Sequence, residues 1–164
     1  MAEPTEVPFD TRAFRNACGK FATGITVVTA TVDGEVHGMT ANGFMSISLD
    51  PPLVAVSVAH KAHMHQFIPA SGRYAVSILR ADQEAYSSHF AGWKVENFQP
   101  QLEQRHDHPV IAQAIACFVT KLYAAHTVGD HTLYIGLVEY FERNDNDPIL
   151  FYGGKYRQLA AVNQ

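Results

Sequence analysis

Short runs of β-branched and aromatic residues, separated by turn residues, most limit what this chain can fold into. The first run, ITVVTATV, ends at Asp33-Gly34, a dipeptide that favours a tight hairpin turn with positive φ. A second strand returns from Glu35, and the later runs are LVAVSVA, YAVSIL, AIACFVTKLYAAHTV, HTLYIGLVEYFER and PILFYGG. Six or seven strands with short helices between them predict a mostly β fold, in which an antiparallel sheet closes into a barrel.

Three other segments have helical patterns. Asp10 or Thr11 can cap a first helix, because their side chains accept hydrogen bonds from free backbone N–H groups. The apolar stripe of that helix comprises Phe14, Ala17, Cys18 and Phe21. HKAHMHQFIPAS and ADQEAYSSHFAG predict two further short helices, whereas the polar stretch WKVENFQPQLEQRHDHPVI predicts a long irregular excursion with one helical turn.

Length and charge limit the classes of protein that fit. The chain has 164 residues, of which 17% are charged, and its formal net charge is −4. We expect a flexible arm at residues 1–9 and a single domain at residues 10–164. No Lys/Arg cluster is present to neutralise a phosphate backbone, so we do not expect nucleic acid as a partner.

The sequence shows no membrane-spanning run, no signal-peptide features and only two cysteines, from which we expect a reducing compartment. No apolar run approaches the ~20 residues of a membrane-spanning helix, and the acidic start MAEPTEVPFD lacks the features of a signal peptide. We therefore expect a cytoplasmic protein that does not bind membranes. Its two cysteines, Cys18 and Cys117, are predicted to be reduced, buried thiols.

The segment VHGMTANGFMSISLDPPL is unusual for a core strand. Asn42 and Gly43 both weaken strand propensity, and glycine leaves the backbone open to close approach. We therefore expect another group to come close to this backbone.

Histidines concentrate in HKAHMH, which supplies His60, His63 and His65. Neutral imidazoles are common zinc or copper ligands. However, His63 and His65 do not share a helical face, and no H-E-x-x-H pattern accompanies them. Their spacing favours surface or anion-contacting histidines over a metal site.

Two further motifs each have two interpretations. In GDHT, Asp130 could hold His131 in one orientation while the other ring nitrogen faces a ligand, but spacing alone favours a strand-edge histidine after a hairpin turn. In FYGGKY, the glycines could form a terminal bulge or a place where a planar ring lies on backbone. Neither a G-x-G-x-x-G nor a P-loop motif occurs.

Five segments in this order carry a resemblance to a known family: FRNACGKFATGITVVTA, HGMTANGFMSISLDPPLV, QEAYSSHFAG, GDHTLYIGLVE and PILFYGGKYRQL. Together they resemble the short-chain flavin reductases of two-component monooxygenases, most of all the branch that serves phenol 2-hydroxylases. The resemblance implies an FMN-binding split barrel, a homodimer, and reduction of FAD or FMN by NADH or sometimes NADPH. The reduced flavin would pass to a separate monooxygenase that hydroxylates an aromatic compound.

The resemblance also assigns the flavin-binding residues. Small side chains and backbone groups would contact the ring system and ribityl chain, and His60-Lys61-Ala62 would bind the flavin phosphates, with Lys61 supplying positive charge. Phe90 could instead serve only to pack its helix. The full set is Thr40, Ala41, Asn42, Gly43, Phe44, Ser46, His60, Lys61, Ala62, Phe90 and Ala91.

For the nicotinamide nucleotide, the resemblance implies that His131 binds and orients it and handles a proton. Hydride transfer to the flavin would then depend chiefly on positioning. The residues predicted to shape the same pocket are Phe151, Tyr152, Gly153 and Gly154.

The chain departs from the family pattern at two places. Gly43 stands where many relatives carry Ser or Ala, and residues 93–108 match less well than the rest. Two other functions remain open, namely a non-catalytic flavin- or haem-binding split-barrel protein and a histidine-rich metal-binding module without flavin. The GDHT and FYGG segments favour the reductase over the non-catalytic protein.

Overall fold

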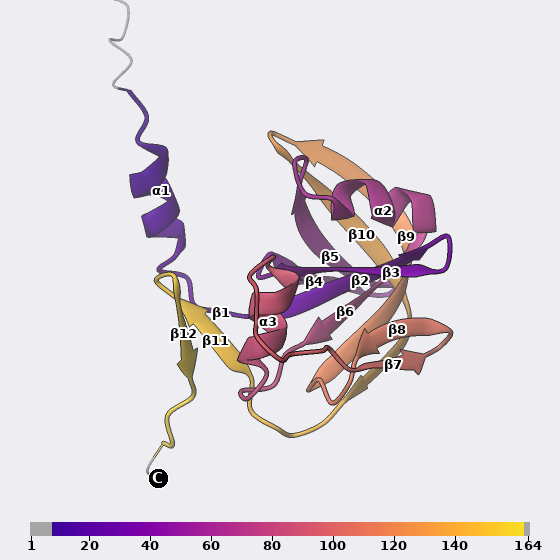
Figure 1. Ribbon diagram of the computed structural model, residues 1–164. Coiled ribbons are helices and arrows are strands. Elements are labelled where there is room, and N and C mark those ends of the chain that lie inside the picture. Colours follow the sequence, from indigo (N-terminus) through magenta and orange to yellow (C-terminus); the bar gives the residue numbers. More distant parts are fainter. Residues whose placement is uncertain (1–7, 163–164) are drawn as a thin grey trace, which may run out of the picture.

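A computed structural model describes residues 8–162, and within this range the chain is mostly antiparallel β-structure (Figure 1). The predicted mostly β fold with short helices is confirmed. The three helices in this range are α1 (Thr11–Cys18), α2 (Met64–Ser71) and α3 (Glu84–Phe90). Of the predicted arm at residues 1–9, the first seven lie outside the described residues.

Seven strands form the main sheet. Their order is β3-β2-β6-β9-β10-β5-β4, and every neighbouring pair is antiparallel. The two edge strands, β3 and β4, follow each other in the chain and are joined only by Asn42 and Gly43. The sheet must therefore curve until its edges meet at this connection, although hydrogen bonds between β3 and β4 do not close it. The strands are β2 (Thr26–Val32), β3 (Glu35–Ala41), β4 (Phe44–Leu49), β5 (Pro52–Ala59), β6 (Arg73–Ile78), β9 (Ala116–Val128) and β10 (His131–Arg143).

Strand β2 is covered on both faces, which explains its nearly continuous apolar sequence. Val28 and Ala30 pack on one face with Met64 and Ile68 of α2. On the other face Val27 packs in a second cluster, against which Phe90 of α3 lies. The two helices thus lie on opposite sides of the sheet near its β3 edge, and they hold that edge strand between them.

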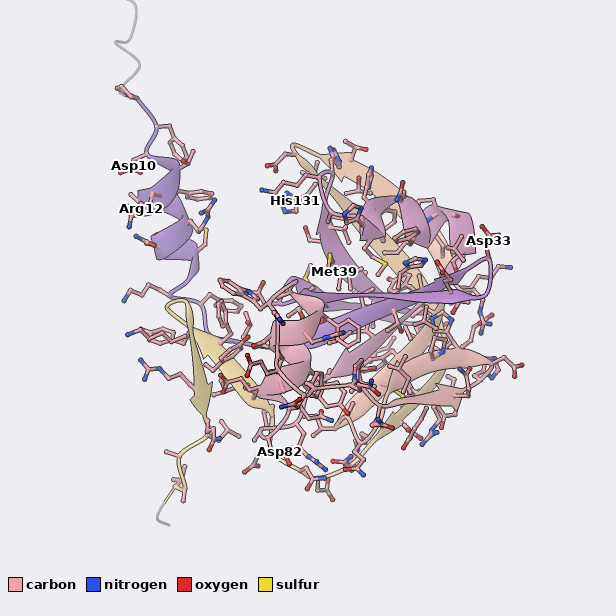
Figure 2. The ribbon with its side chains drawn as sticks, viewed as in Figure 1. Asp10, Arg12, Asp33, Met39, Asp82 and His131 are labelled. Atoms are coloured by element: carbon pink, nitrogen blue, oxygen red, sulfur yellow. The ribbon has the colours of Figure 1, made fainter. Side chains whose placement is uncertain are left out.

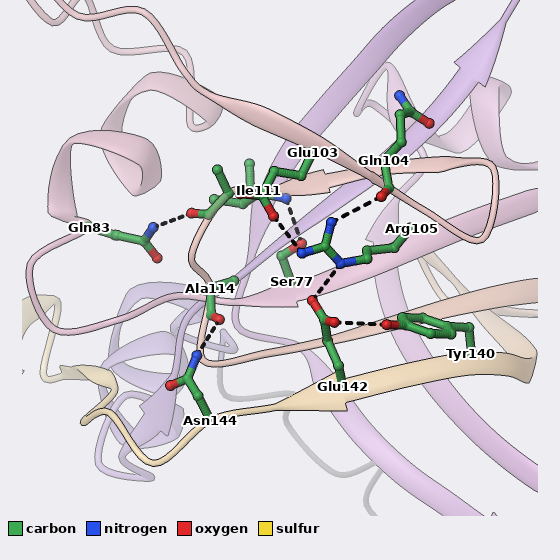
Figure 3. Close-up of polar contacts among 11 residues, drawn as sticks. Ser77, Gln83, Glu103, Gln104, Arg105, Ile111, Ala114, Tyr140, Glu142 and Asn144 are labelled. Atoms are coloured by element: carbon green, nitrogen blue, oxygen red, sulfur yellow. Dashed lines mark hydrogen bonds and ion pairs between the residues drawn. The ribbon is translucent and has the colours of Figure 1, made fainter.

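In the stretch that we predicted to be an irregular excursion with one helical turn, residues 93–101 contain neither helix nor strand, and the remainder forms a hairpin of β7 (Leu102–Arg105) and β8 (His108–Ile111). The prediction was wrong for this second half because the turn consists of His106 and Asp107, both with positive φ, rather than a glycine pair. Arg105 holds the hairpin to the main sheet by donating to Glu142 of β10 at 2.9 Å, and within the hairpin it donates to Glu103 at 2.7 Å (Figure 3).

A small sheet with the order β1-β11-β12 lies beside the main one. It contains β1 (Thr23–Gly24), β11 (Ile149–Tyr152) and β12 (Lys155–Gln158). Gly153 and Gly154 have φ values of 58° and 76° and form the turn between β11 and β12. Strand β12 was not predicted from the sequence, because it lacks an apolar run.

Helix α1 projects away from the rest of the chain (Figure 1). Asp10 caps it as predicted, accepting from the backbone N–H groups of Arg12 and Ala13 at 3.0 Å each. Phe21, which we predicted to belong to its apolar stripe, lies beyond the end of the helix at Cys18. Phe14 is 56% exposed, with the Phe9 ring beside it at 5.4 Å between centroids. No helix in the described part of the chain is long and apolar enough to cross a membrane.

The two cysteines differ in their surroundings, so the prediction that both are buried was wrong for Cys18. Cys18 is exposed because it ends the projecting helix α1. Cys117 is buried in β9, and burial raises the pKa of its thiol to about 11. Cys117 therefore stays protonated and unreactive at neutral pH.

His108 secures β8 to β2. Its Nε2 lies 3.0 Å from the carbonyl oxygen of Thr29, whose hydroxyl donates to the carbonyl of Pro109 at 2.6 Å. Burial lowers the pKa of His108 below its ordinary value of 6.5, and the hydrogen bond to Thr29 opposes this shift.

We predict that the protein loses stability as the pH falls below 6.5. Above this pH His108 is neutral in both states, and below it the unfolded chain takes up the proton first, until the lowered folded-state pKa is passed. Urea unfolding between about pH 5 and 7.5 measures this slope. His108→Gln should flatten it, whereas His126→Gln at an exposed position should not; equal slopes in both variants would contradict the assignment.

Candidate active site

A hollow of about 420 Å³ opens where β3, α3 and the β11–β12 hairpin meet, and we call it the central hollow. Its floor is the end of β3 and the start of the turn that follows. Its walls are the C-terminal end of α3 on one side and the hairpin on the other. The lining residues are Ile25, Thr40, Ala41, Asn42, Ser87, Ser88, Ala91, Trp93, Phe151, Gly154 and Tyr156.

Ser87 links the three elements that enclose the central hollow. The hydroxyl of Thr40 in β3 donates to the carbonyl oxygen of Ser87 at 2.6 Å. The Ser87 hydroxyl in turn shares a 2.8 Å hydrogen bond with the hydroxyl of Tyr156 in β12. Because Ser87 is buried, these bonds are protected from water and fix the walls relative to the floor.

Phe90 seats α3 on β3. A Cβ atom added to Gly38 would lie 2.5 Å from the Phe90 ring, so only glycine lets the ring approach this closely. Phe90 also packs against the cluster that contains Val27 and Leu79. The contacts therefore support the helix-packing interpretation of Phe90, and the ring also lines a second hollow.

This second hollow, of about 610 Å³, continues along β3. It lies between the N-terminal end of α2 and the C-terminal end of α3, and it shares Ala91 with the central hollow. A ligand bound in one hollow could therefore extend into the other. The residues lining it include Val36, His37, Gly38, Met39, Ala62, His63, Met64, Phe67, His89, Phe90, Ala91 and Gly92.

The predicted phosphate-binding segment leads into this second hollow. Ala62 lines it, and Lys61 is exposed beside it in the chain. The ring of His60 is held by a 3.0 Å hydrogen bond between its Nε2 and the Thr132 hydroxyl. Among residues 8–162, no three histidine, cysteine, aspartate or glutamate side chains gather as a metal-binding group.

Three other predicted flavin-binding residues have mainly structural contacts. The carbonyl oxygen of Gly43 accepts from Ser57 N at 2.9 Å, so the group that approaches this backbone is strand β5. The Phe44 ring packs against Phe118, with 5.6 Å between ring centroids. Ser46 is exposed in β4 and pairs with Val54.

The FYGG segment faces two hollows. Phe151 and Gly154 line the central hollow, and with Gly153 they also line a third hollow of about 680 Å³ toward α1. Tyr152 points elsewhere, and the Lys20 ammonium lies 5.6 Å from the centroid of its ring. The glycines therefore form a hairpin turn whose backbone borders the site.

His131 occupies the tip of the β9–β10 hairpin, outside these hollows. Its Nδ1 lies 2.7 Å from the Asp130 carboxylate, which fixes the ring orientation and leaves Nε2 free to meet a ligand. This hydrogen bond is the main cause that lowers the pKa of Asp130. In Figure 2, His131 lies well apart from the β11–β12 hairpin, so the structure does not bring it together with Phe151–Gly154.

Five residues of the central hollow were not predicted from the sequence, namely Ile25, Ser87, Ser88, Trp93 and Tyr156. Ser87 and Ser88 directly precede the HFAG motif and Trp93 directly follows it, so their nearness to that motif was the available signal. Tyr156 lies in β12, which we did not predict.

Residues 18–160 match the sequence model of a family described as "Flavin reductase like domain". This chain is a member of the flavin reductase-like family. An NADH-dependent flavin reductase of a Rhodococcus species is 43% identical over 153 residues, covering 92% of this chain and 87% of that protein. The reductase component of the Thermus thermophilus 4-hydroxyphenylacetate 3-monooxygenase is 41% identical over 149 residues, covering 90% and 96%.

The solved structure of flavin reductase PheA2 in its native state has the same fold as this flavin reductase-like chain. The two superpose with a TM-score of 0.91 at 48% identity, covering 93% of this chain and 100% of PheA2. The family resemblance seen in the five sequence motifs is thus confirmed.

We predict that Gly38→Ala disturbs the central hollow. The added methyl group must displace the Phe90 ring, and with it α3, which should lower the free energy of unfolding by about 1–3 kcal/mol. Chemical denaturation measures this loss. The matched control is Gly24→Ala, because a Cβ at Gly24 meets nothing within 4 Å. Equal stability of the two variants would show that Phe90 does not seat the helix.

Proposed function

We propose that this protein is an NADH-dependent flavin reductase, which reduces FAD or FMN and supplies the reduced flavin to a separate aromatic-hydroxylating monooxygenase. The observation that carries the proposal is the central hollow in a chain of this family. NADPH is an alternative donor. Two relatives are named as an NADH-dependent flavin reductase and as the reductase component of a monooxygenase, which supports both halves of the proposal.

The central hollow suits an uncharged planar ring. None of its lining residues carries a formal charge, and Phe151 and Trp93 supply apolar surface. Asn42, Ser88 and backbone N–H groups can donate hydrogen bonds to ring carbonyl oxygens. Thr40, Ala41 and Asn42 would hold the ring system, with Gly43, Phe44 and Ser46 shaping the turn beside it.

The phosphates of the flavin would lie toward the second hollow, where Lys61 supplies positive charge and His60 and Ala62 shape the approach. Ala91 borders both hollows, so it would lie beside the ribityl chain. Phe90 would support this path by holding α3 in place.

The chain's role in the reaction is to position two ligands. A bound flavin supplies the ring that accepts the hydride from NADH. Phe151, Gly153 and Gly154 would border the nicotinamide end of the dinucleotide beside that ring, and Tyr152 would shape the outer side of the hairpin. His131 would bind a more distant part of the dinucleotide and handle a proton at Nε2, because Asp130 already occupies Nδ1.

We further propose that residues 10–164 act as one split-barrel domain in a homodimer in the cytoplasm. The meeting of the edge strands β3 and β4 at Asn42-Gly43 supports a barrel split along these edges. Exposed apolar side chains support a dimer, since β4 presents Met45, Ile47 and Leu49 and α1 presents Phe14.

We predict opposite effects of two substitutions. His131→Ala should raise the KM for NADH about tenfold and leave the Kd for flavin unchanged, because one hydrogen bond to the dinucleotide is lost. Lys61→Ala should raise the flavin Kd by a similar factor, about tenfold, through loss of a charged phosphate contact. Steady-state kinetics and flavin titration separate the two.

The matched controls are His126→Ala and Lys121→Ala, both at exposed positions of β9. Equal losses in NADH use and flavin binding for His131→Ala would overturn its assignment. An unchanged flavin Kd for Lys61→Ala would remove its phosphate role.

A further inference from the structure

The side chain of Trp93 is 73% exposed at the rim of the central hollow. It is the only tryptophan in the sequence. An indole is one of the largest apolar groups in proteins, so covering it with another apolar group would lower the free energy. Within residues 8–162 it stacks on no other aromatic ring, so stacking inside the chain does not explain its position.

The backbone that carries Trp93 is fixed. Trp93 N donates to the carbonyl oxygen of Ser88 at 3.0 Å, and Gly92 N donates to His89 O at 3.1 Å. Gly92 has a φ of 90°, a left-handed value that turns the chain back after α3. The helix end therefore sets where the indole stands, and most of the indole surface is open to solvent.

From its place at the rim, the Trp93 indole can cover a ligand that lies on the floor of the central hollow. The floor of the central hollow is Thr40–Asn42, and the opposite wall is formed by Phe151 and Tyr156. The Ser87 hydrogen bonds hold floor and walls in place, so the rim residue Trp93 is the large apolar side chain that is free to adjust to a ligand. A planar ring resting on the floor would present an apolar face for the indole to stack on.

We propose that Trp93 covers the isoalloxazine ring of a flavin held in the central hollow and slows its release. The inference rests on the proposed function, and it adds a residue that sets how long the flavin stays. A flavin that must travel to another enzyme has to leave the hollow. Loss of its stacking partner would therefore weaken binding mainly by speeding dissociation.

The test compares Trp93→Ala, Trp93→Phe and the wild type, with FMN as the probe. Trp93→Ala should raise the FMN Kd and its dissociation rate by about tenfold, as expected for loss of a stacked aromatic pair with its buried area. Trp93→Phe should retain most of the affinity. The matched control is Tyr123→Ala, which removes another exposed aromatic side chain, 58% exposed on β9.

A second readout reports contact directly. An indole stacked on an excited isoalloxazine quenches its emission, because an electron passes to the ring and returns. The fluorescence of bound FMN should therefore be low in the wild type and rise in Trp93→Phe, which conserves an aromatic ring that is a poor electron donor. FMN is used because the adenine of FAD would quench the ring by itself.

The possible outcomes separate this inference from the proposed function. A wild-type protein that neither binds FMN nor oxidises NADH overturns both. If the wild type is an active reductase while both Trp93 variants keep their FMN Kd, release rate and emission within twofold, the proposed function stands and the role of Trp93 is overturned. If Trp93→Ala proves unstable, the emission of Trp93→Phe decides the question.

Discussion

The packing of the Phe90 ring on Gly38 is the contact on which the central hollow depends. It brings α3 onto the edge strand β3 at a distance that no other residue at position 38 would permit. Once the helix is seated, the Thr40 hydroxyl can reach the Ser87 carbonyl, and Ser87 can bond to Tyr156. The floor and both walls of the hollow are thus consequences of one glycine in the edge strand β3.

The sequence was sufficient to predict elements with a strong local signal. Strands β2, β5, β6, β9 and β10 follow from β-branched runs, and the Asp10 cap follows from its free carboxylate before α1. The β7–β8 hairpin was missed because His106 and Asp107 adopt positive φ without a glycine, and such turns are fixed by tertiary contacts such as Arg105–Glu142. Strand β12 was missed because KYRQ has no apolar run and pairs at the margin of a small sheet.

In the candidate site, too, the residues with a local sequence signal were predicted and those placed by tertiary contacts were not. Thr40–Asn42, Ala91 and Phe151 were found from motifs, and the structure brings them to one hollow. Ser87 and Trp93 lie beside the HFAG motif, but the motif does not say which of its neighbours line the hollow, because that depends on how α3 and the β11–β12 hairpin meet. Tyr156 could not be found at all, because β12 was not predicted. The glycine at position 43 is explained by the close approach of Ser57 in β5. A Cβ atom added to Gly43 would lie only 3.2 Å from the Ser57 Cβ.

With His131 included as we propose, the distance between His131 and the β11–β12 hairpin would give the binding site an extended form. A nicotinamide dinucleotide has a similarly extended shape, with its reactive ring and its second nucleotide at opposite ends. The hollow is fixed by buried hydrogen bonds, whereas His131 stands on an exposed hairpin tip. The rigid part of the molecule would thus hold the ring that reacts, and the exposed part would capture its co-substrate.

The first measurement to make is the loss of NADH absorbance in air, with FAD, FMN or no added flavin and without a partner protein. A flavin reductase will oxidise NADH rapidly only when flavin is added, and the flavin that gives the faster rate is the preferred one. If NADH persists in every mixture while the protein still binds flavin, the chain is a non-catalytic flavin-binding protein and the account is contradicted.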